Sequence, residues 1–128
     1  MEKNCSVLIK EENKMPFINV KTTAKITPEK ELALKEQLGN AITAIPGKSE
    51  AWLMLNFDDE CRMYFKGSNE KPLAYIEVKI FGSASSDAYD KLTAIITDIF
   101  SNELNISPDC IYVRYSEGTL WGWNGNNF

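Results

Sequence analysis

The chain has 128 residues, of which 44% are hydrophobic and 25% are charged, and its formal net charge is −4. This is the length and composition of one globular domain. Its acidic balance disfavours general nucleic-acid binding, and no apolar run approaches the length of a membrane span. The sequence has no histidine and three scattered cysteines, Cys5, Cys61 and Cys110, which disfavours histidine-based catalysis, a zinc site and a disulfide framework, so we expect neither a metal nor a cofactor.

The first half of the chain predicts a strand, a helix and a second strand. Residues 16–22 are rich in β-branched and aromatic types, which is typical of a strand. Thr27-Pro28-Glu29 begins a helix, because threonine can cap a free backbone N–H and proline suits the first helical position. Pro46-Gly47 ends this helix, and the run 52–57 is apolar almost throughout, which predicts a strand covered on both faces. The apolar residues of the helix recur at helical spacing: Leu34, Leu38, Ile42 and Ile45.

The second half repeats this pattern. Residues 73–81 predict a strand, Ser85-Ser86-Asp87 can cap a helix, and residues 111–115 predict another strand. The halves superpose at one constant spacing, which indicates either an internal duplication or the way in which any two βαβ units of similar size superpose. Cys110, beside the last strand, is expected to be a small buried hydrophobe.

Two βαβ units predict an α+β fold, in which a four-stranded mixed sheet carries both helices on one face because βαβ crossovers are right-handed. The other face is then left uncovered. Since the run 52–57 is apolar, we expect a second copy of the chain to cover that face in a homo-oligomer.

Short motifs occur in a fixed order along residues 15–128: MPFI at 15–18, GK at 47–48, GSNE at 67–70, ISPD at 106–109 and GWN at 122–124. Together they resemble the macrophage migration inhibitory factor family of the tautomerase superfamily. The resemblance implies a single domain over residues 15–128, assembled as a homotrimer, and it leaves residues 1–14 as an N-terminal extension.

The resemblance also implies a general base that needs no histidine. In this family the initiator methionine, here Met15, is removed, and the secondary amine of the exposed proline, here Pro16, catalyses keto–enol tautomerisation. The implied substrates are enolisable 2-oxo acids such as phenylpyruvate, or dopachrome-like compounds. Lys48 matches the residue that binds a substrate carboxylate, and its cation together with an apolar pocket lowers the pKa of the proline amine.

The remaining site residues also follow from the resemblance. Tyr112 matches a pocket tyrosine that a neighbouring subunit contributes, and Trp123 matches an aromatic residue at the pocket rim. Phe17, Phe81 and Arg114 occupy pocket positions at which family members differ. We expect Arg114 to favour small anionic substrates over bulky aromatic ones.

Each assignment has a structural alternative. Lys48 can be a solvated loop lysine, Tyr112 a strand residue packed in an interface, Arg114 a member of a surface ion pair, and Trp123 a core residue. The paired cysteines of the animal cytokine are replaced here by Leu73 and Ile76, so thiol-oxidoreductase activity is not expected.

Residues 1–14 decide the chemistry, because a preceding residue makes the Pro16 nitrogen a non-basic amide. Lys10-Glu11-Glu12 can be encoded by a sequence containing AGGAGG, a bacterial ribosome-binding sequence, so we expect residues 1–14 not to be translated in vivo and synthesis to start at Met15. The alternative is a real polar tail, which would leave a catalytically dead scaffold.

A further alternative is a cytokine-like interaction protein or ligand binder without relevant turnover, with a protein receptor implied by resemblance alone. We expect a cytoplasmic location with no signal peptide, and non-classical secretion stays open.

Overall fold

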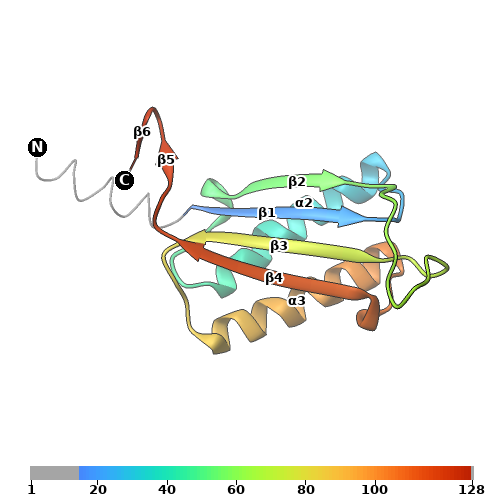
Figure 1. Cartoon of the computed structure of the whole chain (residues 1–128). Coiled ribbons are helices and arrows are strands. Elements are labelled where there is room, and N and C mark those ends of the chain that lie inside the picture. Colours follow the sequence, from blue (N-terminus) through green and yellow to red (C-terminus); the bar gives the residue numbers. More distant parts are fainter. Residues whose placement is uncertain (1–14, 128) are drawn as a thin grey trace, which may run out of the picture.

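The computed structural model describes residues 15–127, so the expectations for residues 1–14 and for Cys5 lie outside the described residues. Four strands form one mixed sheet in the order β2-β1-β3-β4: β1 (Pro16–Thr22), β2 (Met54–Asp58), β3 (Ala74–Phe81) and β4 (Ile111–Gly118). Strands β1 and β2 are parallel, β3 and β4 are parallel, and β1 runs antiparallel to β3. The described chain therefore has the predicted two βαβ units (Figure 1).

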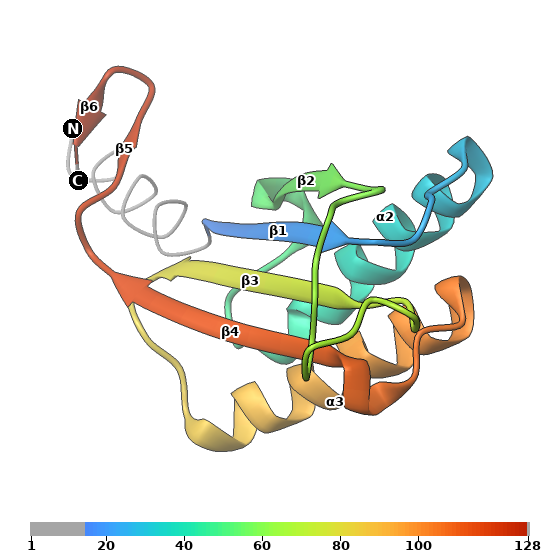
Figure 2. The ribbon, with the colours of Figure 1, turned by 45° about the vertical axis from the view of Figure 1, so that its right-hand side comes forward.

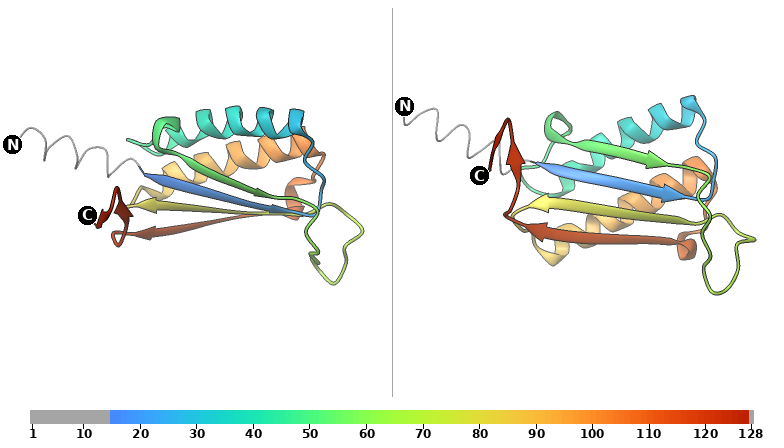
Figure 3. Two further views of the ribbon diagram at one scale, coloured as in Figure 1. Left: turned by 90° about the horizontal axis from the view of Figure 1, so that it is seen from above. Right: turned by 45° about the horizontal axis from the view of Figure 1, so that its top comes forward.

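Both long helices, α2 (Pro28–Ala41) and α3 (Ser86–Leu104), cover the same face of the sheet, as the view from above in Figure 3 shows. Their starts follow the predicted capping: the Thr27 side chain accepts a hydrogen bond from the Lys30 amide, and the Ser85 side chain accepts one from the Ala88 amide. This arrangement confirms the fold class that the sequence predicts.

The core lies between the helices and the inner face of the sheet. Ile18 and Val20 of β1 and Ile76 and Val78 of β3 are fully buried, while the residues between them face the open side. This alternation is what a sheet with one covered face requires. The predicted helix residues join this core, since Leu34, Leu38 and Ile42 of the first helical segment and Leu92, Ile96, Ile99 and Phe100 of α3 are all buried.

The prediction of a fully covered strand at 52–57 is wrong for the single subunit. Trp52 closes a short 3₁₀ turn (Glu50–Trp52), and the strand starts two residues later, at Met54. Strand β2 lies at an edge of the sheet, and Met54 is 67% exposed on the uncovered face. The run 52–57 is apolar almost throughout because it joins Trp52 and Leu53 of the turn to the apolar residues of the strand. In the strand itself, more exposed and less exposed residues alternate.

A small hairpin of β5 (Gly122–Trp123) and β6 (Asn126–Asn127) projects beyond the end of the sheet at which β1 begins (Figure 2). Asn124 and Gly125 at its tip both have positive φ, at 54° and 85°. Asparagine and glycine tolerate this left-handed conformation, and it gives the tight turn that joins two short strands. No helix among residues 15–127 is long and apolar enough to cross a membrane.

Candidate active site

An open groove of about 740 Å³ lies at the end of the sheet where β1 begins. The first residues of β1, the turn before β2 and the start of the C-terminal hairpin form its walls. All three tryptophans of the chain, Trp52, Trp121 and Trp123, line it. Trp52 and Trp123 meet edge to face, with ring centroids 5.1 Å apart. The groove thus presents an aromatic, mostly apolar surface, of the kind that holds small organic ligands.

Pro16 and Phe17 both line this groove. Pro16 is the first residue of β1 and pairs with Ile80 of β3, while Phe17 pairs with Met54 of the edge strand. Met15 precedes Pro16 and is buried, and its carbonyl oxygen accepts a hydrogen bond from the Phe81 amide at 3.2 Å. With Met15 attached, the Pro16 nitrogen is an amide and has no basic lone pair.

Lys48 reaches the same end of the sheet from the loop after α2. Its side chain is only 6% exposed, and its Nζ donates to the carbonyl oxygen of Phe81 at 2.9 Å. Burial lowers the pKa of the Lys48 amine from its ordinary value. Lys48 is therefore not a solvated loop lysine. Phe81, which accepts the hydrogen bond from the Lys48 amine, also donates its amide to the Met15 carbonyl oxygen. Lys48 itself does not line the groove.

Tyr112 and Arg114 lie far from the groove of their own subunit. Both are exposed on the open face, where Tyr112 pairs with Tyr75 and Arg114 with Glu77 of β3. Because Pro16 pairs with Ile80, Tyr112 sits five residues further along the sheet, about 17 Å at the rise of an extended strand. Arg114 sits three residues further along, about 10 Å, and neither side chain lines the groove of its own subunit.

The two β4 residues differ in their surroundings. The Tyr112 ring packs edge to face against Phe65, with centroids 5.2 Å apart, yet Tyr112 remains 60% exposed. Arg114 takes part in none of the ion pairs formed among residues 15–127, so the surface ion-pair alternative is not seen within the subunit. Both side chains are available to a second copy that covers the open face.

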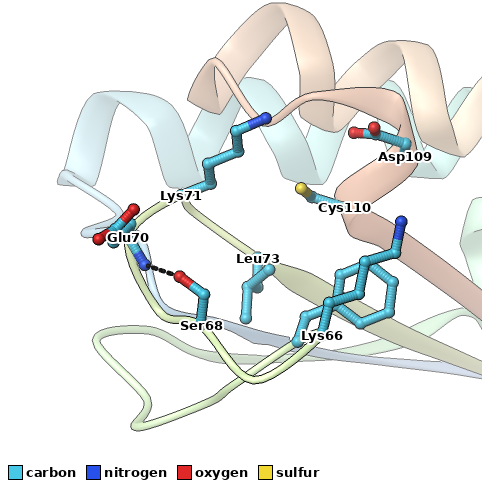
Figure 4. A pocket seen from close by; sticks show the side chains of 8 residues that line it. Lys66, Ser68, Glu70, Lys71, Leu73, Asp109 and Cys110 are labelled. Carbon is cyan, nitrogen blue, oxygen red and sulfur yellow. Dashed lines mark hydrogen bonds between the residues drawn. The ribbon is translucent and has the colours of Figure 1, made fainter.

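A second, smaller hollow of about 200 Å³ lies at the opposite end of the sheet, beside the loop 59–72 and the start of β4 (Figure 4). Its rim carries charges of both signs, from Lys66, Lys71, Glu70 and Asp109. The Cys110 sulfur faces this hollow. Cys110 is half-buried with a free thiol and packs against the core, so the expectation of a small buried hydrophobe holds only in part. Among residues 15–127 no group of three or more histidine, cysteine or acidic side chains is placed to hold a metal ion.

The structure thus brings Pro16, Phe17 and Trp123 into one groove. Phe81 is joined to its end by the backbone hydrogen bond to Met15, and Lys48 is joined to Phe81 by its side-chain amine. The sequence leaves core burial and a pocket role open for the two nearby tryptophans of the tail, Trp121 and Trp123, and both line the groove, whereas Trp52 is a groove residue that sequence reasoning missed. The apolar run predicts that Trp52 belongs to a strand, whereas in the structure Trp52 closes the turn that precedes it. The signal that could have revealed it is the charged pair Lys48 and Glu50 shortly before it, which marks a loop rather than a strand interior.

Comparisons with known proteins agree with this description. The family model "Macrophage migration inhibitory factor (MIF)" matches residues 15–128. Macrophage migration inhibitory factor of Mus musculus is 26% identical over an alignment of 117 residues, and the match covers 89% of this chain and 97% of the relative. The crystal structure of Leishmania major MIF2 is similar with 30% identity and a TM-score of 0.82, covering 89% of this chain and 97% of that one. The homologue from Prochlorococcus marinus is similar with 27% identity and a TM-score of 0.77, covering 88% and 98%.

Proposed function

Because the chain belongs to the macrophage migration inhibitory factor family of the tautomerase superfamily, we propose that it is a keto–enol tautomerase whose general base is Pro16 as the N-terminal residue. Family membership supports isomerase activity in general, and a tautomerase or a cytokine-like function. One observation favours the tautomerase: the buried Lys48 amine is fixed on the Phe81 carbonyl, beside the residue that precedes Pro16.

The proposed chemistry follows from an amine in these surroundings. The Pro16 amine removes a proton from the carbon beside a carbonyl and returns it to the other end of the enolate. To act near neutral pH the amine must lose its own proton easily. The apolar groove and the nearby Lys48 cation both lower the pKa of an amine at that position.

The substrate class that we propose is enolisable 2-oxo acids, such as phenylpyruvate or dopachrome-like compounds. Met15 lines the groove in the described chain, and its removal in this proposal opens the end of the groove toward Lys48, so that a substrate carboxylate pairs there with the Lys48 ammonium. The part formed by Trp52, Trp121 and Trp123 accepts an apolar or aromatic body. Charge pairing in a partly dry site orients the carbonyl toward Pro16.

We further propose that the working site is shared between copies in a homotrimer. The open face of the sheet carries exposed Met54 and Tyr112, at 67% and 60%, and a second copy packed there would bury both. Tyr112 and Arg114 of that copy would then complete the groove of its neighbour. Tyr112 would donate to the developing enolate oxygen, and Arg114 would add a second cation for anionic substrates.

The active chain in this proposal is the domain over residues 15–128, with synthesis starting at Met15 and Met15 then removed. Three proteins test it: a chain produced from the Met15 start, the same chain with Pro16→Gly, and the full 128-residue chain. We expect phenylpyruvate enol–keto conversion by the first alone, with a loss of about a hundredfold or more in the other two.

Equal activity of the glycine variant would refute Pro16 as the base. Inactivity of all three on every 2-oxo acid would favour the interaction-protein alternative. Intact mass of the protein from its native host identifies which start is used.

A further inference from the structure

Glu117, near the end of β4, anchors the connection between β3 and α3, residues 82–85. One of its carboxylate oxygens accepts hydrogen bonds from the Ala84 amide, at 3.3 Å, and from the Tyr89 hydroxyl. The next residue, Gly118, accepts a hydrogen bond from the Gly82 amide at 2.9 Å. The end of β4 therefore fastens the connection at two points.

This connection begins directly after a residue of the candidate site. Phe81 ends β3, and Gly82 turns the chain with a φ of 86°, a conformation that only glycine adopts without strain. The Phe81 carbonyl, which accepts the Lys48 hydrogen bond, lies on the peptide bond that Phe81 shares with Gly82. Any shift of the connection at Gly82 therefore rotates the acceptor that holds the Lys48 amine.

The tyrosine that binds Glu117 is itself fixed on α3. The Tyr89 ring packs against the Tyr115 ring, with centroids 4.5 Å apart. The Tyr115 hydroxyl donates to the Tyr89 carbonyl oxygen at 3.1 Å and lies 2.7 Å from the Thr93 hydroxyl. Hydrogen bonds to an ionised acceptor are stronger and more directional than neutral ones. Glu117 thus joins the end of β4 and the first turns of α3 to the connection between β3 and α3.

We propose that Glu117 is a positioning residue, which acts through residues 82–85 to fix the Phe81 carbonyl and thereby the Lys48 amine. Its effect on substrate binding rests on the proposed function, in which Lys48 receives a substrate carboxylate. Its effect on the Lys48 amine does not. Glu117 contacts neither the groove nor Lys48 directly, so it binds no substrate itself.

The test follows the Lys48 amine by NMR, using the ¹³Cε resonance assigned with Lys48→Arg, in the chain produced from the Met15 start. The variants are Glu117→Ala, which removes the acceptor, and Glu117→Gln, which keeps an acceptor oxygen but removes the charge. Glu36→Ala, which removes an exposed carboxylate on α2, is the matched control. Loss of a carboxylate acting through charge alone would lower the pKa of Lys48, whereas release of its amine toward water would raise it. The two explanations therefore predict opposite signs.

We expect Glu117→Ala to raise the pKa of Lys48 toward its ordinary value, with Glu117→Gln and Glu36→Ala near wild type. We also expect Glu117→Ala to raise KM for phenylpyruvate roughly two- to tenfold, the range for loss of one hydrogen bond, with no matching rise for its methyl ester. A lowered or unchanged Lys48 pKa in Glu117→Ala would overturn the proposal, as would equal shifts in the alanine and glutamine variants. If the alanine variant does not fold, Glu117→Asp replaces it, because the shorter side chain reaches the Ala84 amide and the Tyr89 hydroxyl less well. A raised pKa of Lys48 in Glu117→Asp then supports the proposal, and a lowered or unchanged pKa overturns it. An inactive wild type would refute the proposed function and leave the NMR result decisive for Glu117.

Discussion

Lys48 and Phe81 form the central contact of the site. The Lys48 Nζ donates to the Phe81 carbonyl oxygen at 2.9 Å, while the Phe81 amide donates to the Met15 carbonyl at 3.2 Å. One residue therefore joins a buried cation to the chain on the N-terminal side of Pro16. The sequence places Lys48 and Phe81 33 residues apart, and the contact forms only once the loop after α2 is folded against the end of β3.

The burial of Lys48 predicts a pH dependence of stability with a defined sign. Burial lowers the pKa of this amine in the folded protein below its unfolded value of 10.5. Between the lowered folded pKa and 10.5 the unfolded chain binds more protons, so this group increases the free energy of unfolding as pH rises through that window. Below this pH window the buried Lys48 cation lowers the free energy of unfolding by a constant amount.

Lys48→Met isolates this effect, because it removes the titrating amine and keeps a long side chain. We expect the stability difference between Lys48→Met and wild type to shift in favour of wild type as pH rises toward 10.5. Urea unfolding of both proteins at several pH values measures it. Lys35→Met, at an exposed lysine of α2, is the control and should show no comparable change. A difference that does not vary with pH would mean that Lys48 is not buried as a charged amine.

The aromatic groove predicts a spectroscopic signal for ligand binding. All three tryptophans line it, so an aromatic 2-oxo acid bound there should quench most of the intrinsic tryptophan fluorescence. Trp52→Phe keeps an aromatic ring but loses the edge-to-face partner geometry with Trp123, and we expect it to weaken binding roughly tenfold or less. Titration of fluorescence gives both affinities. Binding that leaves the emission unchanged would place the ligand outside this groove.

The fold was predictable because its signals are local and periodic. Thr27 and Ser85 cap the helices as expected, and the alternation at Ile18 and Val20 repeats at Ile76 and Val78. The candidate site was only partly predictable. The resemblance named Lys48 and Trp123, but nothing local in the sequence says that the Lys48 amine is buried on a distant carbonyl. Trp52 was missed because a turn and a strand read as one apolar run, and Tyr112 cannot be placed at the groove by one subunit alone.

Arg114 predicts a selectivity for charge. Its side chain is exposed on the open face and pairs with no described acidic residue within the subunit, so it can bind an anion that a neighbouring groove presents. We expect Arg114→Asn to lower kcat/KM for phenylpyruvate about three- to thirtyfold, and to change the rate for the methyl ester much less. Arg62→Asn, on the loop 59–72, is a control for loss of one positive charge elsewhere. Equal effects on acid and ester would refute a carboxylate-binding role for Arg114.

The shared site predicts that two inactive chains restore each other. Pro16 and Tyr112 lie at opposite ends of one sheet, so a complete groove must take them from different copies. In a trimer reassembled from equal amounts of Pro16→Gly and Tyr112→Phe chains, roughly a quarter of the grooves would hold both native residues. We expect each variant alone to lose about tenfold or more, and the unfolded and refolded mixture to regain roughly a quarter of wild-type activity. Light scattering should give the mass of a trimer for every sample.

A mixture of Pro16→Gly and Lys48→Met is the control, because Pro16 and Lys48 come from the same chain, so no groove in a mixed trimer regains both. Recovery in the control, or none in the first mixture, would contradict a site completed by the neighbouring subunit.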